Sequence, residues 1–344
     1  MSITKKYIIN GPSNIVRLTN NDKILYIMGH VPNSIYNQTE CQYNDDYEGF
    51  DIDKFMLLFM KKNKIKNYDL FVNIYNTSFK SNNTNFYKET YIDAITKLFQ
   101  YYLIKNKTDV KINPKYPNFR FHYSNNMNTI LNYEYIINFY NDNILNVPFN
   151  NLNINSIFQI LKEKLIETKN SLLNNSSIEK ILNKYSNDQI KIKINDIYIK
   201  YIDSQFNILF DLINNLLENN KQLSENIVLN NINTISVIYN YILIIINDLF
   251  FIRRFLDKNY IKNVILFTNV NNLTNIIYIL VKFFNFKVTN LYNYSNINKF
   301  NEFILNYNIT NTLHYIKDIN NTFELINDST IQCVNLFDFP DDFN

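Results

Sequence analysis

A long block without glycine divides this sequence into three parts. Between residues 126 and 257 there is no glycine and only one proline, Pro148, and the apolar residues follow a helical spacing almost throughout. Because Gly and Pro are the residues that most often interrupt helices and mark turns, the block is predicted to consist of long helices. The residues on either side of it show short apolar runs bounded by turn residues, which is typical of strands alternating with helices.

The first part of the chain, residues 1–125, predicts an α/β arrangement. Two apolar runs flank the turn-rich residues 19–22 and indicate a β-hairpin or two adjacent strands. Asp51 stands where it can cap the first helix. The expected strands and helices are, in chain order, Ile15–Leu18, Ile24–Met28, a helix over Ile52–Lys62, Asp69–Ile74, a helix over about Lys88–Ile104, and Phe119–Tyr123.

The last part of the chain returns to the α/β pattern. A strand is predicted over Asn263–Thr268, a helix over Leu273–Phe284 and a strand over Phe286–Asn290. A sheet made of these residues alone would be small for independent stability, so both ends of the chain are expected to share one mixed sheet. The fold class predicted is α/β with a large all-helical insertion, in parts 1–125, 126–258 and 259–344.

Charge and cysteine content limit the partners and the compartment. Lys+Arg number 34 and Asp+Glu 31, giving a formal net charge of +3, far from the surplus of a protein that wraps nucleic acid through its phosphates. Cys41 and Cys333 are too few for a CxxC metal site or a disulfide framework, and the start MSITKKYIIN lacks the apolar run of a signal peptide. We therefore expect a reducing, cytosol-like compartment and no secretion.

One apolar run raises the question of a membrane span. Residues Ile232–Phe251 are nearly all apolar, but Asn240, Asn247 and Asp248 would place polar groups at bilayer depth. A buried core helix is the better interpretation, and no membrane span is expected.

The abundance of asparagine reflects the genome more than the function. Asn makes up roughly a fifth of the chain, against a few per cent in ordinary proteins, and Gly numbers only 3. Asn, Ile, Lys, Tyr and Phe have AT-rich codons, so an AT-rich genome, such as that of many large DNA viruses and some protists, explains this bias.

Histidine is the strongest catalytic signal in the chain, and there are three: His30, His122 and His314. They have no metal-ligand spacing. His30 follows Gly29 at the carboxyl end of a predicted strand, where catalytic groups gather, but no acid stands near it. His314 is expected at the surface.

Strand alternation places His122 on one face with Arg120. These two residues could line a cleft, but a hydrogen-bonded structural pair is the favoured interpretation. GxSxG, GxxxxGK and GxGxxG are absent, and 3 glycines cannot build a Gly-rich phosphate cradle, which argues against most nucleotide-binding enzymes.

Several segments, in this order and spacing, resemble an uncharacterised family of giant-virus proteins of the mimivirus kind. They are ILYIMGH, NQTEC, NYDLFVNIY, NFRFHY, LFFIRRFLDKNYIKNVILFTN, IIYILVKFFNFKVTN and QCVNLFDFPDDFN. Members of this family tend to read G-D-x-H where this chain has Gly29–Pro32, and an acidic residue where it has Asn73. They tend to read H-x-x-D-x-R from His122 and T-G-x-x-H over Thr268–Asn272.

This resemblance implies a distant similarity to TIKI, ChaN and erythromycin-esterase-like hydrolases, which use histidines and acids for metal-assisted or general-base hydrolysis. The positions that carry over are Gly29, Asp69, His122 and Thr268. The family's histidines are replaced by Pro32 and Asn272, and its acid by Asn73. Asn cannot act as a general base and is a poor metal ligand, so the resemblance implies a site that has kept its fold and lost its chemistry.

The function predicted is that of a catalytically degenerate viral protein that acts by binding or as a structural protein. No cofactor or metal is expected, a protein partner is expected, and the place of action is the host cytoplasm, the virus factory or the virion. The alternative is a divergent hydrolase in which His30 and His122 converge with an acid such as Asp69 or Glu40. A virion structural protein is a third class. The degenerate site should gather Gly29, Asn73, His122 and residues 269–272 at one end of the sheet.

Overall fold

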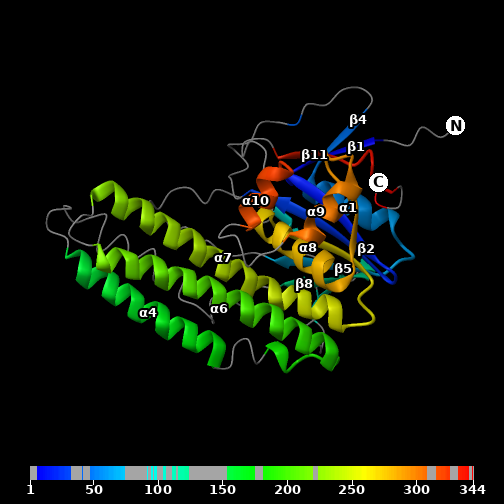
Figure 1. Cartoon of the computed structure of the whole chain (residues 1–344). Helices are drawn as coiled ribbons and strands as arrows, with labels where there is room; N and C mark the ends of the chain where they lie inside the picture. The colour runs from blue at the N-terminus through cyan, green and yellow to red at the C-terminus, as the bar shows by residue number, and fades with distance from the viewer. Residues whose placement is uncertain are drawn as a thin grey trace. The chain divides into compact units, whose positions relative to one another are not determined.

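The computed structural model divides the chain into two compact units (Figure 1). The α/β unit comprises residues 1–125, 258–307 and 316–344, and the helical unit comprises residues 126–257 and 308–315. The structure describes residues 6–31, 41, 47–73, 91, 94–95, 97–98, 104–105, 111–113, 115–123, 153–174, 181–219, 224–307, 315–325, 332–340 and 343.

A mixed sheet forms the centre of the α/β unit. Eight described strands follow one another across it in the order β10-β2-β3-β9-β5-β8-β7-β6. The four central strands, β3, β9, β5 and β8, are parallel, and β2 and β7 flank them antiparallel. Their bounds are β2 Asn14–Asn20, β3 Lys23–His30, β5 Tyr68–Asn73, β6 Ile104–Lys105, β7 Lys111–Asn113, β8 Tyr116–Tyr123, β9 Asn263–Asn269 and β10 Lys287–Leu291.

Strand β9 joins the two ends of the chain, because it pairs with β3 on one side and β5 on the other. Ile27 and Phe71 both lie opposite Leu266, in register across the three strands. The prediction that strands from both ends of the sequence share one sheet with a helical insertion between them is therefore confirmed. The hairpin is also confirmed, since β2 pairs antiparallel with β3 across Asn21 and Asp22.

A second, three-stranded sheet was not predicted from the sequence. It has the order β11-β1-β4 and consists of β1 Lys6–Asn10, β4 Tyr47–Asp51 and β11 Cys333–Asn335. These strands are too short to show alternation, and β11 is held by pairing with β1 from the other end of the chain. Tertiary pairing, which the sequence pattern does not show, decides their conformation.

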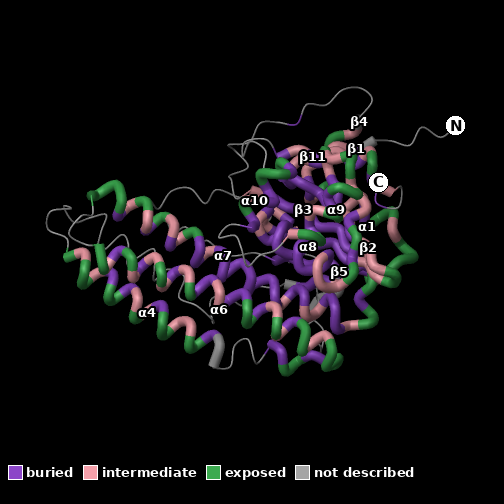
Figure 2. The backbone as a smooth tube through the Cα atoms, viewed as in Figure 1, coloured by how far each residue is buried: buried purple, intermediate pink, exposed green. Residues whose placement is uncertain are grey.

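Helices cover both faces of the main sheet. Helix α1, Ile52–Lys62, packs Phe55 and Phe59 into an apolar cluster on one face. On the other face lies α8, Val270–Phe284, followed by α9, Ile297–Asn306, and α10, Tyr315–Thr322. Figure 2 shows the strands between these helices as buried.

Two local expectations about the first part of the chain are corrected. Helix α1 begins at Ile52 as predicted, but Asp51 makes no side-chain cap; its carboxylate instead accepts from Lys54 Nζ and Asn10 Nδ2. The helix expected up to Ile104 ends earlier, because Ile104 is in strand β6 and pairs with Ile112. Of the residues expected in this helix, the structure describes 91, 94–95 and 97–98 as helical, and the others before Ile104 lie outside the described residues.

The two cysteines form a disulfide, which corrects the expectation drawn from their number. Cys41 and Cys333 are joined with their Cα atoms 5.7 Å apart, across a sequence separation of 292. The pairing of β11 with β1 brings Cys333 to the amino-terminal part of the chain, and spacing along the sequence could not show this. Nearby, the Gln332 side chain accepts from Val31 N and donates to Val31 O, so it continues the ladder beyond β3.

The helical unit contains three long described helices: α4 Ile154–Asn174, α6 Asp188–Glu218 and α7 Glu225–Asp257. Helix α6 packs against both α4 and α7. Its N-terminus is fixed by Asp257, whose carboxylate accepts from the backbone N–H groups of Ser186 and Asn187 at 2.6 and 3.0 Å. A carboxylate at this position satisfies donors that a helix start leaves open.

Among the described residues, α7 is the one helix long and apolar enough to cross a membrane by length and composition. Of its most apolar window, 78% is buried inside the protein, as in the core helix of a folded domain. Asn247 and Asp248 are fully buried. Burial raises the pKa of the Tyr198 phenol well above its ordinary value, and the nearby Asp248 adds to the rise. These contacts place the polar residues of α7 in a protein interior.

Gly29 generates the first prediction. A Cβ atom at this position would lie 2.8 Å from Leu273 Cδ1 and 3.4 Å from Val270 Cα, so α8 can approach β3 closely only because residue 29 has no side chain. We expect Gly29→Val to lower the free energy of unfolding by about 1–3 kcal/mol through overpacking, measured by urea denaturation. Gly49→Val, at an exposed position of β4, is the matched control and should change it little. Equal effects at both sites would contradict this account.

The disulfide generates the second prediction. Closing a loop of 292 residues restricts the unfolded chain, so a Cys41→Ser/Cys333→Ser variant should lose about 2–5 kcal/mol of stability. Reduction should lower the melting temperature of the natural chain and leave that of the variant unchanged. If both thiols of the unreduced, purified protein react with iodoacetamide, the bond is absent and the prediction fails.

Candidate functional site

The two described histidines point to opposite faces of the main sheet. His122 lies in register with Phe71, which lies in register with Leu266 and, across β9, with Ile27. His30 is three residues beyond Ile27, and an odd offset along a strand reverses the side-chain direction. The histidines therefore cannot share a site, and the convergence required by the hydrolase alternative is not found for His30.

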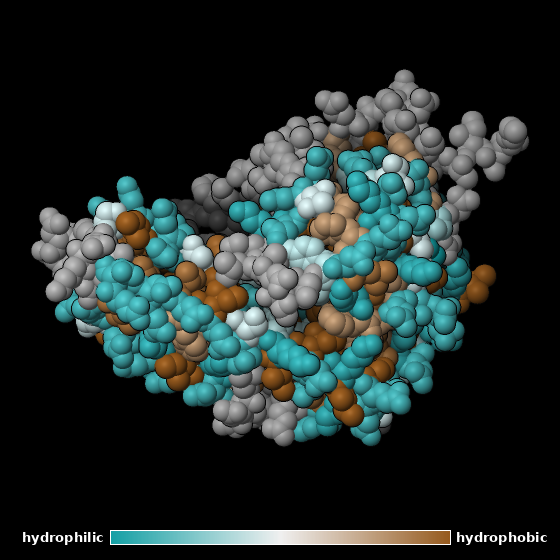
Figure 3. Space-filling model, in the orientation of Figure 1, coloured by the Kyte–Doolittle hydropathy of each residue, from teal (hydrophilic) through white to brown (hydrophobic). Residues whose placement is uncertain are grey.

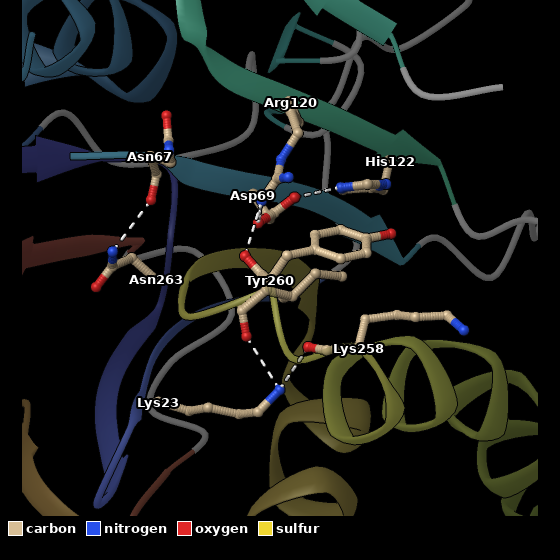
Figure 4. Close-up of polar contacts among 9 residues, drawn as sticks. Lys23, Asn67, Asp69, Arg120, His122, Lys258, Tyr260 and Asn263 are labelled. Atoms are coloured by element: carbon tan, nitrogen blue, oxygen red, sulfur yellow. Dashed lines mark hydrogen bonds and ion pairs between the residues drawn. The ribbon is translucent and has the colours of Figure 1, made fainter. Parts of the chain in front are cut away.

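Asp69 on β5 is the centre of a buried charged cluster (Figure 4). Its carboxylate accepts from His122 Nε2 at 2.6 Å through Oδ1, and from an Arg120 guanidinium nitrogen at 2.5 Å through Oδ2. The side chain of Asp69 is 0% exposed and that of His122 is 1% exposed. Phe71 stacks on the His122 ring with a centroid distance of 4.3 Å. This cluster is sealed from substrate-sized molecules on its described sides.

Arg120 connects this cluster to the loop that precedes β9. Its guanidinium also donates to the Tyr260 carbonyl at 3.1 Å and lies over the Tyr260 ring at 4.8 Å. Lys23 reaches the same loop and donates to the carbonyls of Lys258 and Ile261 at 2.9 and 3.0 Å. Figure 4 shows both side chains directed at this loop. Arg120 and Lys23 thus bind the loop before β9 to β8 and β3.

The members of the cluster lie at different heights in the sheet. Asp69 is the second residue of β5 and pairs with Val264, the second residue of β9. His122 is the next-to-last residue of β8, towards the carboxyl ends of the parallel strands, where open α/β sheets bind their ligands. The favoured interpretation was a hydrogen-bonded pair of Arg120 and His122; in the structure each of them bonds to Asp69.

His30 lies at the carboxyl end of β3 beside a small pocket. Its Nδ1–H donates to the Thr268 carbonyl at 2.9 Å, and the side chain is largely buried. The pocket is otherwise apolar, with Gly11, Tyr91 and Phe267 among the residues that line it. No described acid lines this pocket, and the bond that orients the His30 ring runs to a backbone carbonyl.

Three residues of the expected degenerate site lie side by side on adjacent strands. Gly29 on β3 is opposite Thr268 on β9, which is opposite Asn73 on β5. Thr268 Oγ1 donates to the Asn73 carbonyl at 3.0 Å, and both residues are fully buried. Their contacts join strands, and the missing side chain of Gly29 makes room for α8.

The residues that follow Thr268 form the start of α8. Asn269 is the N-cap, and its side-chain oxygen accepts from Asn271 N at 2.9 Å. Asn272, which stands where the family pattern has a histidine, is fully buried in the first turn. Asn is among the preferred N-cap residues, so this stretch has a structural use at the carboxyl end of β9.

Other expected site residues fall outside the described part of the chain. They are Pro32, Glu40 and His314. Among the described residues, no group of three or more His, Cys, Asp or Glu side chains is placed to hold a metal ion.

Local sequence does not show the partner of His122. The hydrolase alternative names Asp69 as an acid near both histidines, whereas the favoured structural interpretation pairs His122 with Arg120 alone. The structure supplies that acid, because β5 and β8 are parallel neighbours with Asp69 opposite Arg120. The available signal was an Asp in a strand with otherwise apolar neighbours, together with an Arg-x-His in the next strand that the sequence predicts.

Comparison with known proteins places the chain among viral relatives. A family model described as a family of unknown function, DUF5847, matches residues 7–126 and 222–344. The chain belongs to this family. The match includes α7 and the α/β segments on both sides, and it omits α4 and α6.

The chain is similar to uncharacterised proteins of Acanthamoeba polyphaga mimivirus. It is 26% identical to protein R706 over 369 residues, which cover 84% of this chain and 87% of R706. It is 36% identical to protein R160 over 115 residues, covering 33% of this chain and 24% of R160. No solved structure matches the chain. The resemblance to an uncharacterised giant-virus family is confirmed, and its hydrolase part stays a hypothesis.

The charged cluster generates the third prediction. Asp69→Asn keeps the shape of the side chain but leaves Arg120 without its buried counter-charge. Breaking a buried pair in this way is expected to lower the free energy of unfolding by about 3–5 kcal/mol. Asp51→Asn is the control in the same unit, because its ion pair with Lys54 is exposed and should cost about 1 kcal/mol or less. Urea denaturation measures both, and a loss at Asp69 no larger than at Asp51 would contradict a stabilising cluster.

Proposed function

We propose that this protein acts by binding and not by catalysis, as a family member whose site has lost its reactive groups. One observation supports the proposal: the described candidate residues make contacts that join parts of the fold. His122 and Asp69 are sealed together with Arg120, and Thr268 and Asn73 join two strands. General-base or metal-assisted hydrolysis needs an open histidine, carboxylate or metal beside the substrate.

Membership in a family of unknown function is compatible with this role and assigns no reaction. A protein partner fits a chain that presents a rigid α/β unit together with a helical unit. We propose the host cytoplasm, the virus factory or the virion as the place of action. The Cys41–Cys333 disulfide favours the virion among these, because cytosolic thiols are kept reduced.

The hydrolase alternative keeps one supporting observation. The His122–Asp69 hydrogen bond is the orienting contact found in many general-base pairs. In this alternative His122 would be the base, and the fold would have to open for the substrate to reach it.

A comparison of activity and stability separates the two functions and is the fourth prediction. Ester, peptide and phosphoester substrates are offered to the purified protein with and without Mn²⁺ or Zn²⁺. We expect no turnover that depends on His122. We expect His122→Asn to lower the free energy of unfolding by about 1–3 kcal/mol, because a buried hydrogen bond is lost. A roughly hundredfold loss of a real activity at an unchanged melting temperature would instead identify His122 as a catalytic base.

A structural test complements the assay. Crystals soaked in Mn²⁺ or Zn²⁺ should give no stoichiometric anomalous peak near Gly29, Asn73, His122 or residues 269–272. Such a peak would overturn the proposal of a degenerate site.

A further inference from the structure

The amino-terminal edge of the main sheet carries a concentration of lysines. The segments that enter the strands at this edge are residues 21–23, 63–67, 113–115, 258–262 and 285–287. Asp22 is the one acidic residue in these segments. Their lysines are Lys23, Lys64, Lys66, Lys115, Lys258, Lys262 and Lys287. Because the whole chain has a net charge of only +3, this edge is far more positive than the average surface.

Strand register places these segments along one line. Lys287 lies opposite Thr19, Thr19 opposite Ile24, Ile24 opposite Asn263, and Asn263 opposite Tyr68. Neighbouring strands are about 4.8 Å apart, so the row from β10 to β8 spans roughly 24 Å. Loops that end on one line can contact a flat surface at the same time.

Exposed apolar side chains lie among these lysines. Ile65 is 96% exposed, between Lys64 and Lys66, and Tyr260 is 52% exposed in the loop before β9. Leu305 is 49% exposed near the end of α9, where its carbonyl accepts from Lys282 Nζ. In Figure 3, brown hydrophobic atoms project singly from a largely teal surface near the end of the sheet where Figure 1 labels β2 and β5.

The loop that carries Ile65 has a fixed conformation. Asn118 Nδ2 on β8 donates to the carbonyls of Asn63 at 2.6 Å and Lys66 at 2.8 Å, on either side of Ile65. A loop held at both ends presents its side chains without a large ordering cost on binding. This loop therefore holds the apolar side chain of Ile65 almost wholly in water.

We propose that this edge docks on an anionic phospholipid surface. Lysines near such a surface are attracted by its negative potential, and a projecting aliphatic side chain can enter the boundary between headgroups and acyl chains. A nucleic acid is a poorer fit, because phosphate groups bind lysines but make no apolar contact with Ile65 and Leu305. Base stacking needs an open aromatic face, and the Arg120 guanidinium lies over the Tyr260 ring. The proposal is independent of whether the chain is catalytic.

The chain supplies a matched control for the test. Lys64-Ile65-Lys66 has the same sequence as Lys191-Ile192-Lys193 on α6, in which Ile192 is 62% exposed. Charge reversal or removal of the isoleucine at either place changes the protein's composition identically. A difference between the two places therefore reports position and not net charge.

The experiment is vesicle co-sedimentation of the whole protein. Vesicles of phosphatidylcholine alone are compared with vesicles that contain roughly one third phosphatidylserine, at low and at physiological ionic strength. The natural chain should bind the anionic vesicles only. Lys64→Glu/Lys66→Glu should weaken this binding by about tenfold or more, and Ile65→Ser by several-fold. Lys191→Glu/Lys193→Glu and Ile192→Ser should bind as the natural chain does.

Two results would overturn the proposal. The first is that the natural chain does not bind vesicles, binds them equally with and without phosphatidylserine, or loses binding to the same extent in both sets of variants. The other is binding of a single-stranded RNA oligonucleotide that depends on Lys64 and Lys66 while vesicle binding does not, which would assign the edge to nucleic acid. Circular dichroism of every variant ensures that a loss of binding is not a loss of fold.

Discussion

The pairing of β9 with both β3 and β5 is the interaction on which the rest of the α/β unit depends. Residues 263–269 lie between two strands from the first part of the chain, in register with each. Without β9, β3 and β5 would each present an open edge to solvent. The helical block lies in the sequence between β8 and β9, so the sheet is complete only when residues on both sides of this block pair. These pairings join residues that are far apart in the sequence.

The same sheet separates the residues that a catalytic interpretation would combine. One face holds His122, Asp69 and Arg120, and the other holds His30 together with the apolar cluster that α1 joins. Two polar groups on opposite faces of one sheet are divided by the backbone itself. The described polar groups on the two faces make contacts within the fold, with Asp69 on one face and with the Thr268 carbonyl on the other.

The sequence predicts the main strands well because their apolar runs are long and bounded by turn residues, as at Ile24–Met28 and Asn263–Thr268. It could not predict β11, whose three residues are extended only because β1 lies beside them. The disulfide of Cys41 and Cys333 escaped for the same reason. In the site, strand alternation places Arg120 and His122 on the same face. The acid that binds both, Asp69, comes from the neighbouring strand β5, and local sequence does not predict which strands are neighbours.

The disulfide changes the connectivity of the molecule as well as its stability. Since Cys41 and Cys333 are joined, the chain between them is a covalent ring. A protease that cuts once anywhere in that ring, including the long helical block, opens it without releasing a fragment. The protein stays a single covalent molecule after its first cut, and only a second cut or a reductant can separate its parts.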